Sequence, residues 1–175
     1  SDPEINLPIG AEGEIAIKCD GQMIEFWKNK KATDERISSD GFVLTGDIGK
    51  LDGNGYLYVL DRKDDMIISG GFNIWPAELE NIILSHPEVS EVAVFAGPHE
   101  KWGETPIAVC VIPKSVEVAE SEIIELCSSK LGSYKKPTKV IFQTESLPKS
   151  PVGKIQRKVL REPFWNKDER RVKGA

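Results

Sequence analysis

The sequence has few of the residues from which metal sites and disulfide frameworks are built. Three cysteines and two histidines occur in 175 residues. Cys19, Cys110 and Cys127 lie far apart in the chain, and none forms a CxxC or Cys/His pattern, so we expect free or buried thiols in a reducing compartment. The histidines, His86 and His99, are too isolated to form a zinc site. We therefore expect no metal site in this chain.

The sequence also lacks the signals that direct a chain into or across a membrane. No stretch approaches the roughly 18 apolar residues of a membrane-spanning helix. The opening segment, SDPEINLPIGAEGE, lacks the basic and apolar regions of a secretory signal peptide. The net charge of −5 argues against binding of nucleic acid or an anionic membrane by the whole surface, so any anion site must be local. We expect a cytoplasmic protein without a membrane span or a nucleic-acid partner.

What is present predicts an α+β protein in two parts. Residues 13–60 show β-strand patterns, a DGNG turn at 52–55 that is typical of a hairpin, and one helix-like interruption near 29–37. Residues 62–175 mix helices and strands, so we expect a compact α+β domain in which helices flank a central three-stranded sheet. Residues 1–61 are expected to form a small β subdomain. The charged segment DRKDD (61–65) joins the two parts, and its alternative interpretation is a solvated loop.

Two short motifs near this junction could contact a ligand. Asp47 lies between glycines in LTGDIG, where a carboxylate can accept two hydrogen bonds from a vicinal diol such as a ribose; alternatively it caps a turn. Arg62 could pair with a phosphate or a ribose oxygen. Gly70 and Gly71 have no side chains, so a thin ligand could pass close to their backbone; the alternative is a plain hairpin turn.

Aromatic and basic residues further along could contact a nucleotide. Trp102 lies in the loop HEKWGETP, where an indole could stack on a purine or pack in the interior. Tyr134 stands beside Lys135 and Lys136, which would suit a phosphorylated nucleotide; the alternative is a solvated basic patch.

One lysine is set apart from the others. Lys154 follows Gly153 in the proline-bounded loop LPKSPVGK, and a basic, helix-like run begins directly after it. We expect the glycine to let the loop swing, so that the ammonium can reach and neutralise a developing negative charge. A surface lysine without a role is the alternative.

Taken together and in this order, three motifs resemble those of a known family. The three motifs are, in order, TGD, DRKDDMIISGGFNIWPAELE and LPKSPVGKIQR. They resemble the carboxy-terminal motifs of the adenylate-forming superfamily, which includes acyl- and aryl-CoA synthetases, luciferases and adenylation domains of peptide synthetases. The resemblance covers nearly the whole chain, and HEKWGE and LREPFW look most like the fatty-acyl and aryl-CoA ligases.

The resemblance implies a role for each candidate in the first half-reaction of such a ligase, in which a carboxylic acid and ATP form an acyl-adenylate. Asp47 resembles the acid that grips the ribose hydroxyls, and Arg62 the arginine that assists it. Asp64 matches the hinge between the large and the small domain. Lys154 matches the lysine that enters the site only during adenylation.

In the second half-reaction coenzyme A displaces AMP, after a rotation of the small domain. Gly70 and Gly71 then resemble the glycine turn of the pantetheine tunnel. Trp102, Tyr134 and Lys136 match positions that contact coenzyme A in some members.

The resemblance also implies what this chain does not contain. The phosphate loop, the adenine-binding stretch and the acyl pocket belong to an amino-terminal domain upstream, so we expect a carboxy-terminal fragment that is inactive alone. ATP or AMP and coenzyme A are the expected cofactors, with Mg²⁺ accompanying ATP but without ligands in this chain. Two alternatives remain: an adenylation domain that loads a carrier protein, and a non-catalytic interaction or coenzyme A-binding module.

Overall fold

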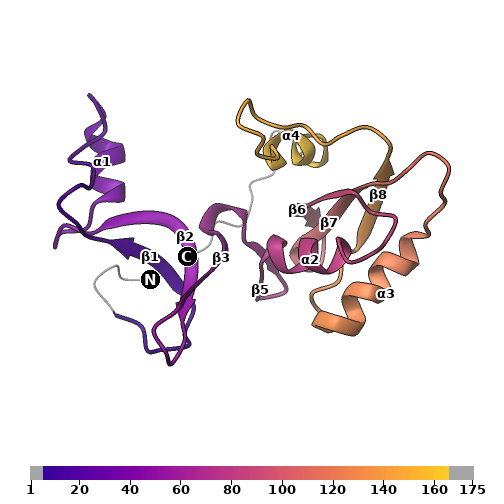
Figure 1. Ribbon diagram of the computed structural model, residues 1–175, viewed down its shortest axis with the longest axis horizontal. Helices are drawn as coiled ribbons and strands as arrows, with labels where there is room; N and C mark the ends of the chain where they lie inside the picture. The colour runs from indigo at the N-terminus through magenta and orange to yellow at the C-terminus, as the bar shows by residue number, and fades with distance from the viewer. Residues whose placement is uncertain (1–5, 166–175) are drawn as a thin grey trace. The chain divides into compact units, whose positions relative to one another are not determined.

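The computed structural model describes residues 6–165, which divide into two compact units with the boundary after Asp64 (Figure 1). We call residues 6–64 unit 1 and residues 65–165 unit 2, and describe each by itself.

Unit 1 is a three-stranded antiparallel sheet with one short helix. Strands β1 (Gly13–Ile17), β2 (Val43–Leu51) and β3 (Leu57–Arg62) follow one another in space in the order β1-β2-β3. Helix α1 (Lys30–Arg36) lies between β1 and β2 in sequence, and the Asn29 side chain caps it by accepting the Ala32 N–H at 3.1 Å. The helix near 29–37 that the sequence predicts is confirmed.

The predicted hairpin at residues 52–55 is also confirmed, and Asp52 explains its geometry. The Asp52 carboxylate accepts the backbone N–H groups of Asn54 and Tyr56, both at 2.9 Å, and Gly55 has a φ of +85°. These hydrogen bonds fold the chain back on itself between β2 and β3 without help from distant residues.

Unit 2 is built on a five-stranded sheet. Its strands are β4 (Ile67–Ser69), β5 (Phe72–Ile74), β6 (Glu91–His99), β7 (Gly103–Val111) and β8 (Lys139–Gln143). The order is β5-β4-β7-β6, and β8 pairs with β7 in parallel. The α+β class is confirmed, but the expected number of three central strands is wrong. The two very short strands β4 and β5 join the sheet through a single pairing of Ser69 with Gly103, which strand patterns could not reveal.

Helices cover both faces of this sheet. Helix α2 (Pro76–Ile83) has proline in its first turn, and α3 (Glu120–Leu131) ends at Gly132, whose φ is +89°. Helix α4 (Arg157–Arg161) and the 3₁₀ turn η2 (Glu162–Phe164) follow the Lys154 loop. Figure 1 shows α4 on one side of the strands and α2 and α3 on the other.

Alternate residues of the two central strands face these two layers. One cluster contains Val92, Val94, Ala108 and Cys110 together with residues of α2 and α3. The second contains Ala93, Phe95, Ile107 and Val109, against which Leu147, Ile155, Leu160 and Phe164 pack. The strands β6 and β7 are therefore buried on both faces, which explains their nearly continuous apolar sequences. No helix within residues 6–165 combines the length and the apolar character that crossing a bilayer requires.

Candidate functional site

Asp47 and Arg62 face each other across the antiparallel pair β2–β3. Their Cα atoms are register partners, and Arg62 Nε lies 2.7 Å from Asp47 Oδ1. The Asp47 side chain is 33 % exposed. Since the ion pair uses only Oδ1, the second carboxylate oxygen keeps its acceptor capacity toward solvent or a ligand. Asp47 is thus a strand residue and not the cap of a turn.

Glu14, which the sequence analysis missed, supports the backbone beside this pair. Its Oε1 accepts the Gly46 N–H at 3.0 Å, and its Oε2 lies 3.0 Å from Lys63 Nζ. Gly46 has a φ of +78°, and a Cβ there would come within 2.6 Å of a nitrogen of Arg36. The positive φ therefore favours glycine at position 46, immediately before Asp47.

The predicted hinge residue Asp64 lies in the short 3₁₀ turn η1 (Lys63–Asp65), and its side chain is exposed. The residues on either side of it are held by ion pairs. Lys63 pairs with Glu14, and Asp65 Oδ2 lies 3.2 Å from Arg157 Nη1. The segment is therefore a structured turn and not a freely solvated loop.

Lys154 stands in a compact turn and not in a loose loop. The Ser150 N–H donates to the Lys154 carbonyl and the Gly153 N–H to the Ser150 carbonyl, both at 2.8 Å, and the Lys154 N–H donates to Ser150 Oγ at 3.2 Å. A bridge between Lys149 and Ile155 closes the base of the turn. Gly153 has a φ of +80°, a conformation that favours glycine, so it permits this tight turn; the swing of the loop stays a prediction.

The base of this turn is anchored to the sheet through Glu91 on β6. Lys149 Nζ lies 2.8 Å from one Glu91 oxygen, and the Leu147 N–H donates to the other at 3.1 Å. The hydrogen bond from Lys149 is the main reason that the pKa of Glu91 lies below its usual value, and the Leu147 N–H adds to it. By contrast, the exposed Lys154 ammonium forms no ion pair or hydrogen bond within residues 6–165.

Arg157, at the start of α4, connects the Lys154 turn to the rest of unit 2. Its guanidinium donates to both oxygens of Glu80 on α2, with Nη2 at 2.7 and 2.9 Å and Nε at 3.1 Å, and it pairs with Asp65. These side chains are mostly buried, and a bidentate arginine–carboxylate pair of this kind fixes geometry well. The sequence analysis did not single out Arg157 or Glu80.

The Gly70–Gly71 turn lies against Trp102. Both glycines have positive φ, +58° and +86°, as a two-residue type I′ hairpin turn between β4 and β5 requires. The Gly70 N–H donates to the Trp102 carbonyl at 3.2 Å, and a Cβ on Gly70 would lie 3.4 Å from the indole. Trp102 is 42 % exposed and stacks on His99, with ring centroids 4.3 Å apart. It is therefore not an interior packing residue.

Tyr134 lies near the same turn, because it contacts Phe72, the residue that follows the two glycines. The two rings lie 5.0 Å apart, and both are more than half exposed. Lys135 pairs with Glu78 and lies over the Tyr134 ring, whereas Lys136 is exposed. Phe72, which directly follows the glycines, is a further residue that the sequence analysis missed. The structure thus brings the glycine turn, Trp102 and Tyr134 to one surface of unit 2.

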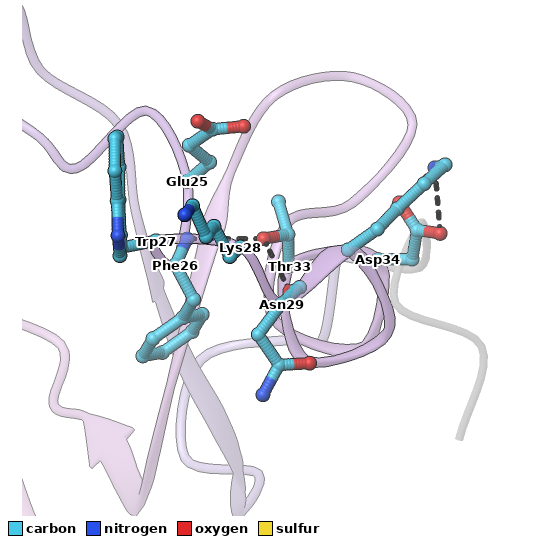
Figure 2. A pocket seen from close by; sticks show the side chains of 8 residues that line it. Glu25, Phe26, Trp27, Lys28, Asn29, Thr33 and Asp34 are labelled. Carbon is cyan, nitrogen blue, oxygen red and sulfur yellow. Dashed lines mark hydrogen bonds and ion pairs between the residues drawn. The ribbon is translucent and has the colours of Figure 1, made fainter.

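A cavity of about 560 Å³ in unit 1 contains none of the predicted site residues. It is lined by the segment 25–30 and by Thr33 and Asp34, and Figure 2 shows Trp27 and Phe26 at its side. Thr33 Oγ1 accepts the Phe26 N–H at 3.0 Å. Within residues 6–165, no three His, Cys, Asp or Glu side chains are grouped closely enough to hold a metal ion.

Comparison with known proteins identifies this architecture. The AMP-binding enzyme C-terminal domain family matches residues 78–154. The long-chain-fatty-acid–CoA ligase FadD13 of Mycobacterium tuberculosis is 49% identical over 153 residues, which cover 87% of this chain and 30% of that ligase. The 2-succinylbenzoate–CoA ligase of Bacillus cereus is 46% identical over 156 residues, which cover 89% of this chain and 32% of that ligase.

A solved structure gives the same result in three dimensions. ATP-bound MatB from Rhodopseudomonas palustris matches with a TM-score of 0.86 and 38% identity, over 94% of this chain and 33% of that chain. The chain therefore spans about a third of the length of the proteins that it matches. On these matches of sequence and of fold, the chain belongs to the adenylate-forming enzymes and carries their AMP-binding C-terminal domain.

Proposed function

We propose that this chain is the part of an ATP-dependent acyl-CoA ligase that contributes Lys154, the hinge and part of the coenzyme A surface. In that reaction a carboxylate attacks the α-phosphate of ATP, giving an acyl-adenylate and pyrophosphate. The thiol of coenzyme A then displaces AMP to form the thioester. The names of the two relatives described above, both CoA ligases, support this reaction class.

The observation that carries the proposal is the contrast between two lysines of one turn. Lys149 is neutralised by Glu91, whereas the Lys154 ammonium is exposed and unpaired within the described residues. Two unit charges 4 Å apart interact by about 4 kcal/mol at an effective dielectric constant near 20. A cation placed between the substrate carboxylate and the α-phosphate would offset a repulsion of this size as the two anions approach.

Unit 1 would hold the nucleotide sugar. The Asp47 carboxylate has one oxygen engaged by Arg62 and can accept hydrogen bonds from the two ribose hydroxyls with its remaining lone pairs. Arg62 would keep the carboxylate oriented for this task. Its own guanidinium, more than half exposed, keeps further N–H donors for a ribose or phosphate oxygen.

Unit 2 would present the coenzyme A surface. The Gly70–Gly71 turn carries no side chains, so the thin pantetheine arm could pass close to its backbone. The exposed rings of Trp102, Tyr134 and Phe72 could stack on adenine, and the exposed Lys136 ammonium suits a phosphate.

The remaining parts of the site would come from outside this chain. Unit 1 exposes large apolar side chains, with Ile24 89 % and Trp27 81 % exposed, and we infer that an amino-terminal domain covers them. That domain would bind the phosphates and the carboxylic acid. The Mg²⁺ expected with ATP would also be held there, because the described residues offer no grouped ligands.

The two half-reactions, measured separately in the ligase that contains this chain, test the role of Lys154. Lys154→Ala should lower acyl-adenylate formation by about 10²- to 10³-fold, the usual effect of removing one preorganised electrostatic group. Thioester formation from supplied acyl-adenylate should change by less than about twofold, because Lys154 would be absent from that step. Lys158→Ala, on the adjoining helix, is the matched control and should leave both steps unchanged. Equal loss in both half-reactions would contradict the assignment.

The chain by itself should be inactive but able to bind a ligand. We expect no pyrophosphate release with a panel of carboxylic acids, and robust turnover would overturn the proposal. Titration with coenzyme A by calorimetry separates the alternatives. Binding that Trp102→Ala weakens favours the ligase, whereas association with a phosphopantetheine carrier protein without coenzyme A binding favours a carrier-loading enzyme. Coenzyme A binding by the chain together with an inactive full-length protein would favour a non-catalytic module.

A further inference from the structure

The Gly70–Gly71 turn is attached to the central sheet by few contacts. Strand β4, which leads into the turn, has three residues and shares one register pair with β7, Ser69 with Gly103. The next residue, Gly70, donates its N–H to the Trp102 carbonyl at 3.2 Å. Because a two-stranded hairpin is only marginally stable by itself in water, the position of this turn depends on what else holds β4.

A buried carboxylate supplies a third contact between β4 and β7. Glu104 is completely buried, and its Oε2 accepts the Ile68 N–H at 3.0 Å, where the ladder would otherwise continue through a backbone acceptor. No buried side-chain nitrogen or oxygen of the described residues lacks a partner, so both oxygens of this carboxylate are satisfied. A buried carboxylate is costly unless hydrogen bonds replace the lost water. Since Glu104 has no exposed surface, it can affect a ligand only through the strand that it holds.

A second side chain, His99 at the end of β6, holds Trp102 in two ways. Its Nδ1 accepts the N–H of Lys101 at 3.2 Å and that of Trp102 at 3.3 Å, which fixes the backbone of the loop between β6 and β7. Its ring stacks on the indole, with the ring planes 10° apart, which fixes the side chain. Because the Trp102 carbonyl accepts the Gly70 N–H, the loop that His99 fixes also holds the glycine turn.

From these contacts we propose that Glu104 and His99 are positioning residues for the surface formed by Gly70, Gly71 and Trp102. Glu104 holds the glycine turn against β7, and His99 holds the indole beside it. This inference rests on the function proposed above, which assigns the surface to coenzyme A, whereas the contacts themselves are properties of the chain. A thiol that must meet a reacting carbon loses its productive geometry when its arm is displaced by about 1 Å, so small shifts of this surface should matter.

Amide hydrogen exchange of the 175-residue chain tests the role of Glu104 without any activity. Glu104→Gln keeps the shape of the side chain but weakens the acceptor, so the amides of Ile68 and Gly70 should exchange about tenfold faster or more. Glu120→Gln alters another carboxylate that accepts a strand N–H, at 2.7 Å on β8, and as the matched control it should leave both rates unchanged. An unchanged rate at Ile68 would overturn the proposal. An equal acceleration at Ile123 in α3 would also overturn it, because Glu104 would then support the whole core and not the turn.

Two variants separate the two contacts of His99. His99→Asn retains an acceptor near the position of Nδ1 but has no ring, and His99→Phe retains a ring but has no acceptor. In the first variant the ring-current shifts of the Trp102 indole protons should be lost, while its amide exchange stays within about twofold. In the second variant the shifts should persist, while the amide exchanges about tenfold faster or more. Identical responses of the two variants would contradict the two contacts.

The other histidine of the chain provides the control for these variants. His86 Nδ1 also accepts a backbone N–H, that of Glu88 at 3.3 Å. His86→Asn should therefore leave both the indole shifts and the amide exchange of Trp102 unchanged. Changes as large as those of the His99 variants would show that the effect is not specific to His99, and the proposal would fail.

Kinetics of the ligase that contains this chain test the consequence for the reaction. Glu104→Gln and His99→Ala should each raise the KM for coenzyme A about tenfold or more, while acyl-adenylate formation stays within about twofold. His86→Asn and Glu120→Gln should change neither quantity. If Trp102→Ala raises this KM and the two positioning variants do not, the proposal is wrong. If Trp102→Ala leaves the KM unchanged while the exchange and shift results hold, the assignment of this surface to coenzyme A fails and the positioning contacts stand.

Discussion

The two units differ most in what they bury. Unit 2 contains 21 of the 22 buried hydrophobic residues of the described chain, and unit 1 contains only Ile48. Helix α1 buries none of its residues, whereas α2 buries Leu79 and Ile83 completely. Because burial of apolar surface is the main favourable term in folding, unit 2 has a core of its own and unit 1 does not. The fold of unit 1 therefore depends mainly on the backbone pairing of its strands.

The largest expected effect is the difference between the two units when they are produced separately. Residues 65–175 should fold cooperatively, because the buried clusters on both faces of the sheet lie within them. Residues 1–64 should remain largely unfolded. Far-UV circular dichroism during a urea titration measures the folding of each piece. A cooperative unfolding transition of residues 1–64 alone would contradict the claim that only unit 2 folds by itself.

The cysteines extend the contrast to chemical reactivity. Burial raises the pKa of Cys110 to about 12, with a further contribution from Cys127, and burial raises that of Cys127 to about 11. Against the usual value of 9.0, the Cys110 thiolate at neutral pH is depleted about a thousandfold. Cys19 in unit 1 is exposed. Iodoacetamide should therefore label Cys19 alone in the native chain and all three in urea, as mass spectrometry can show; fast native labelling of Cys110 would mean that the core of unit 2 opens.

Cavity-forming substitutions should affect the units unequally. Leu79→Ala removes a completely buried side chain and should lower the free energy of unfolding of unit 2 by about 2–5 kcal/mol. Ile48→Ala, the matched change in unit 1, should leave the urea midpoint of unit 2 unchanged within error. Amide NMR signals followed through a urea titration report each unit separately. A shift of the unit 2 midpoint by Ile48→Ala would show that the two units unfold together.

The smallest expected effect is the loss of stabilisation at low pH, when a carboxylate that holds a turn in each unit becomes protonated. The pKa of Glu91 is lowered, chiefly by Lys149, so the stabilisation that this pair contributes is present above about pH 4.5 and is lost as pH falls through the lowered value. Since Lys149 is 39 % exposed, we expect less than about 1 kcal/mol. The Leu147 amide shift should titrate with Glu91, and Glu91→Gln should abolish that titration.

The turn of unit 1 provides the comparison for this titration. The pKa of Asp52 is also lowered, chiefly by the Tyr56 N–H, so its hydrogen bonds too weaken as pH falls through the lowered value. Those bonds span at most six residues, because the farthest donor is the Tyr58 hydroxyl at 3.2 Å, whereas Glu91 and Lys149 are 58 apart in sequence. Asp52→Asn should therefore alter shifts only near residues 52–58. Changes in chemical shift at more distant residues would show that this turn, like the turn anchored by Glu91 in unit 2, is coupled to distant parts of the chain.

Features with a local physical cause could be predicted from the sequence. The DGNG turn and the helix near residues 29–37 depend on side chains within a few residues of them, and the structure has both where the sequence indicates. The overall α+β class follows from the same local patterns.

Features that depend on distant partners could not be predicted. The sequence contains no sign that Arg157 meets Glu80, which is 77 residues away, or that Glu14 meets Lys63 across 49 residues. The expected sheet of unit 2 was too small for the same reason, because β4 joins it through one residue pair. The sequence also did not reveal the left-handed turn at Gly153, because it depends on the hydrogen bonds of Ser150.

If Lys154 acts as proposed, the closed turn around it would have a consequence for the timing of the reaction. Fixing the backbone of one residue costs about 1–2 kcal/mol of conformational entropy, and in this turn that cost is met once, when the chain folds. An ammonium mounted on such a preformed tip needs no ordering of its backbone at each catalytic cycle. The arrival of the ammonium would then be set by the rotation of a whole domain and not by the closure of a loop. The rate at which adenylation begins should therefore fall as the viscosity of the solvent rises.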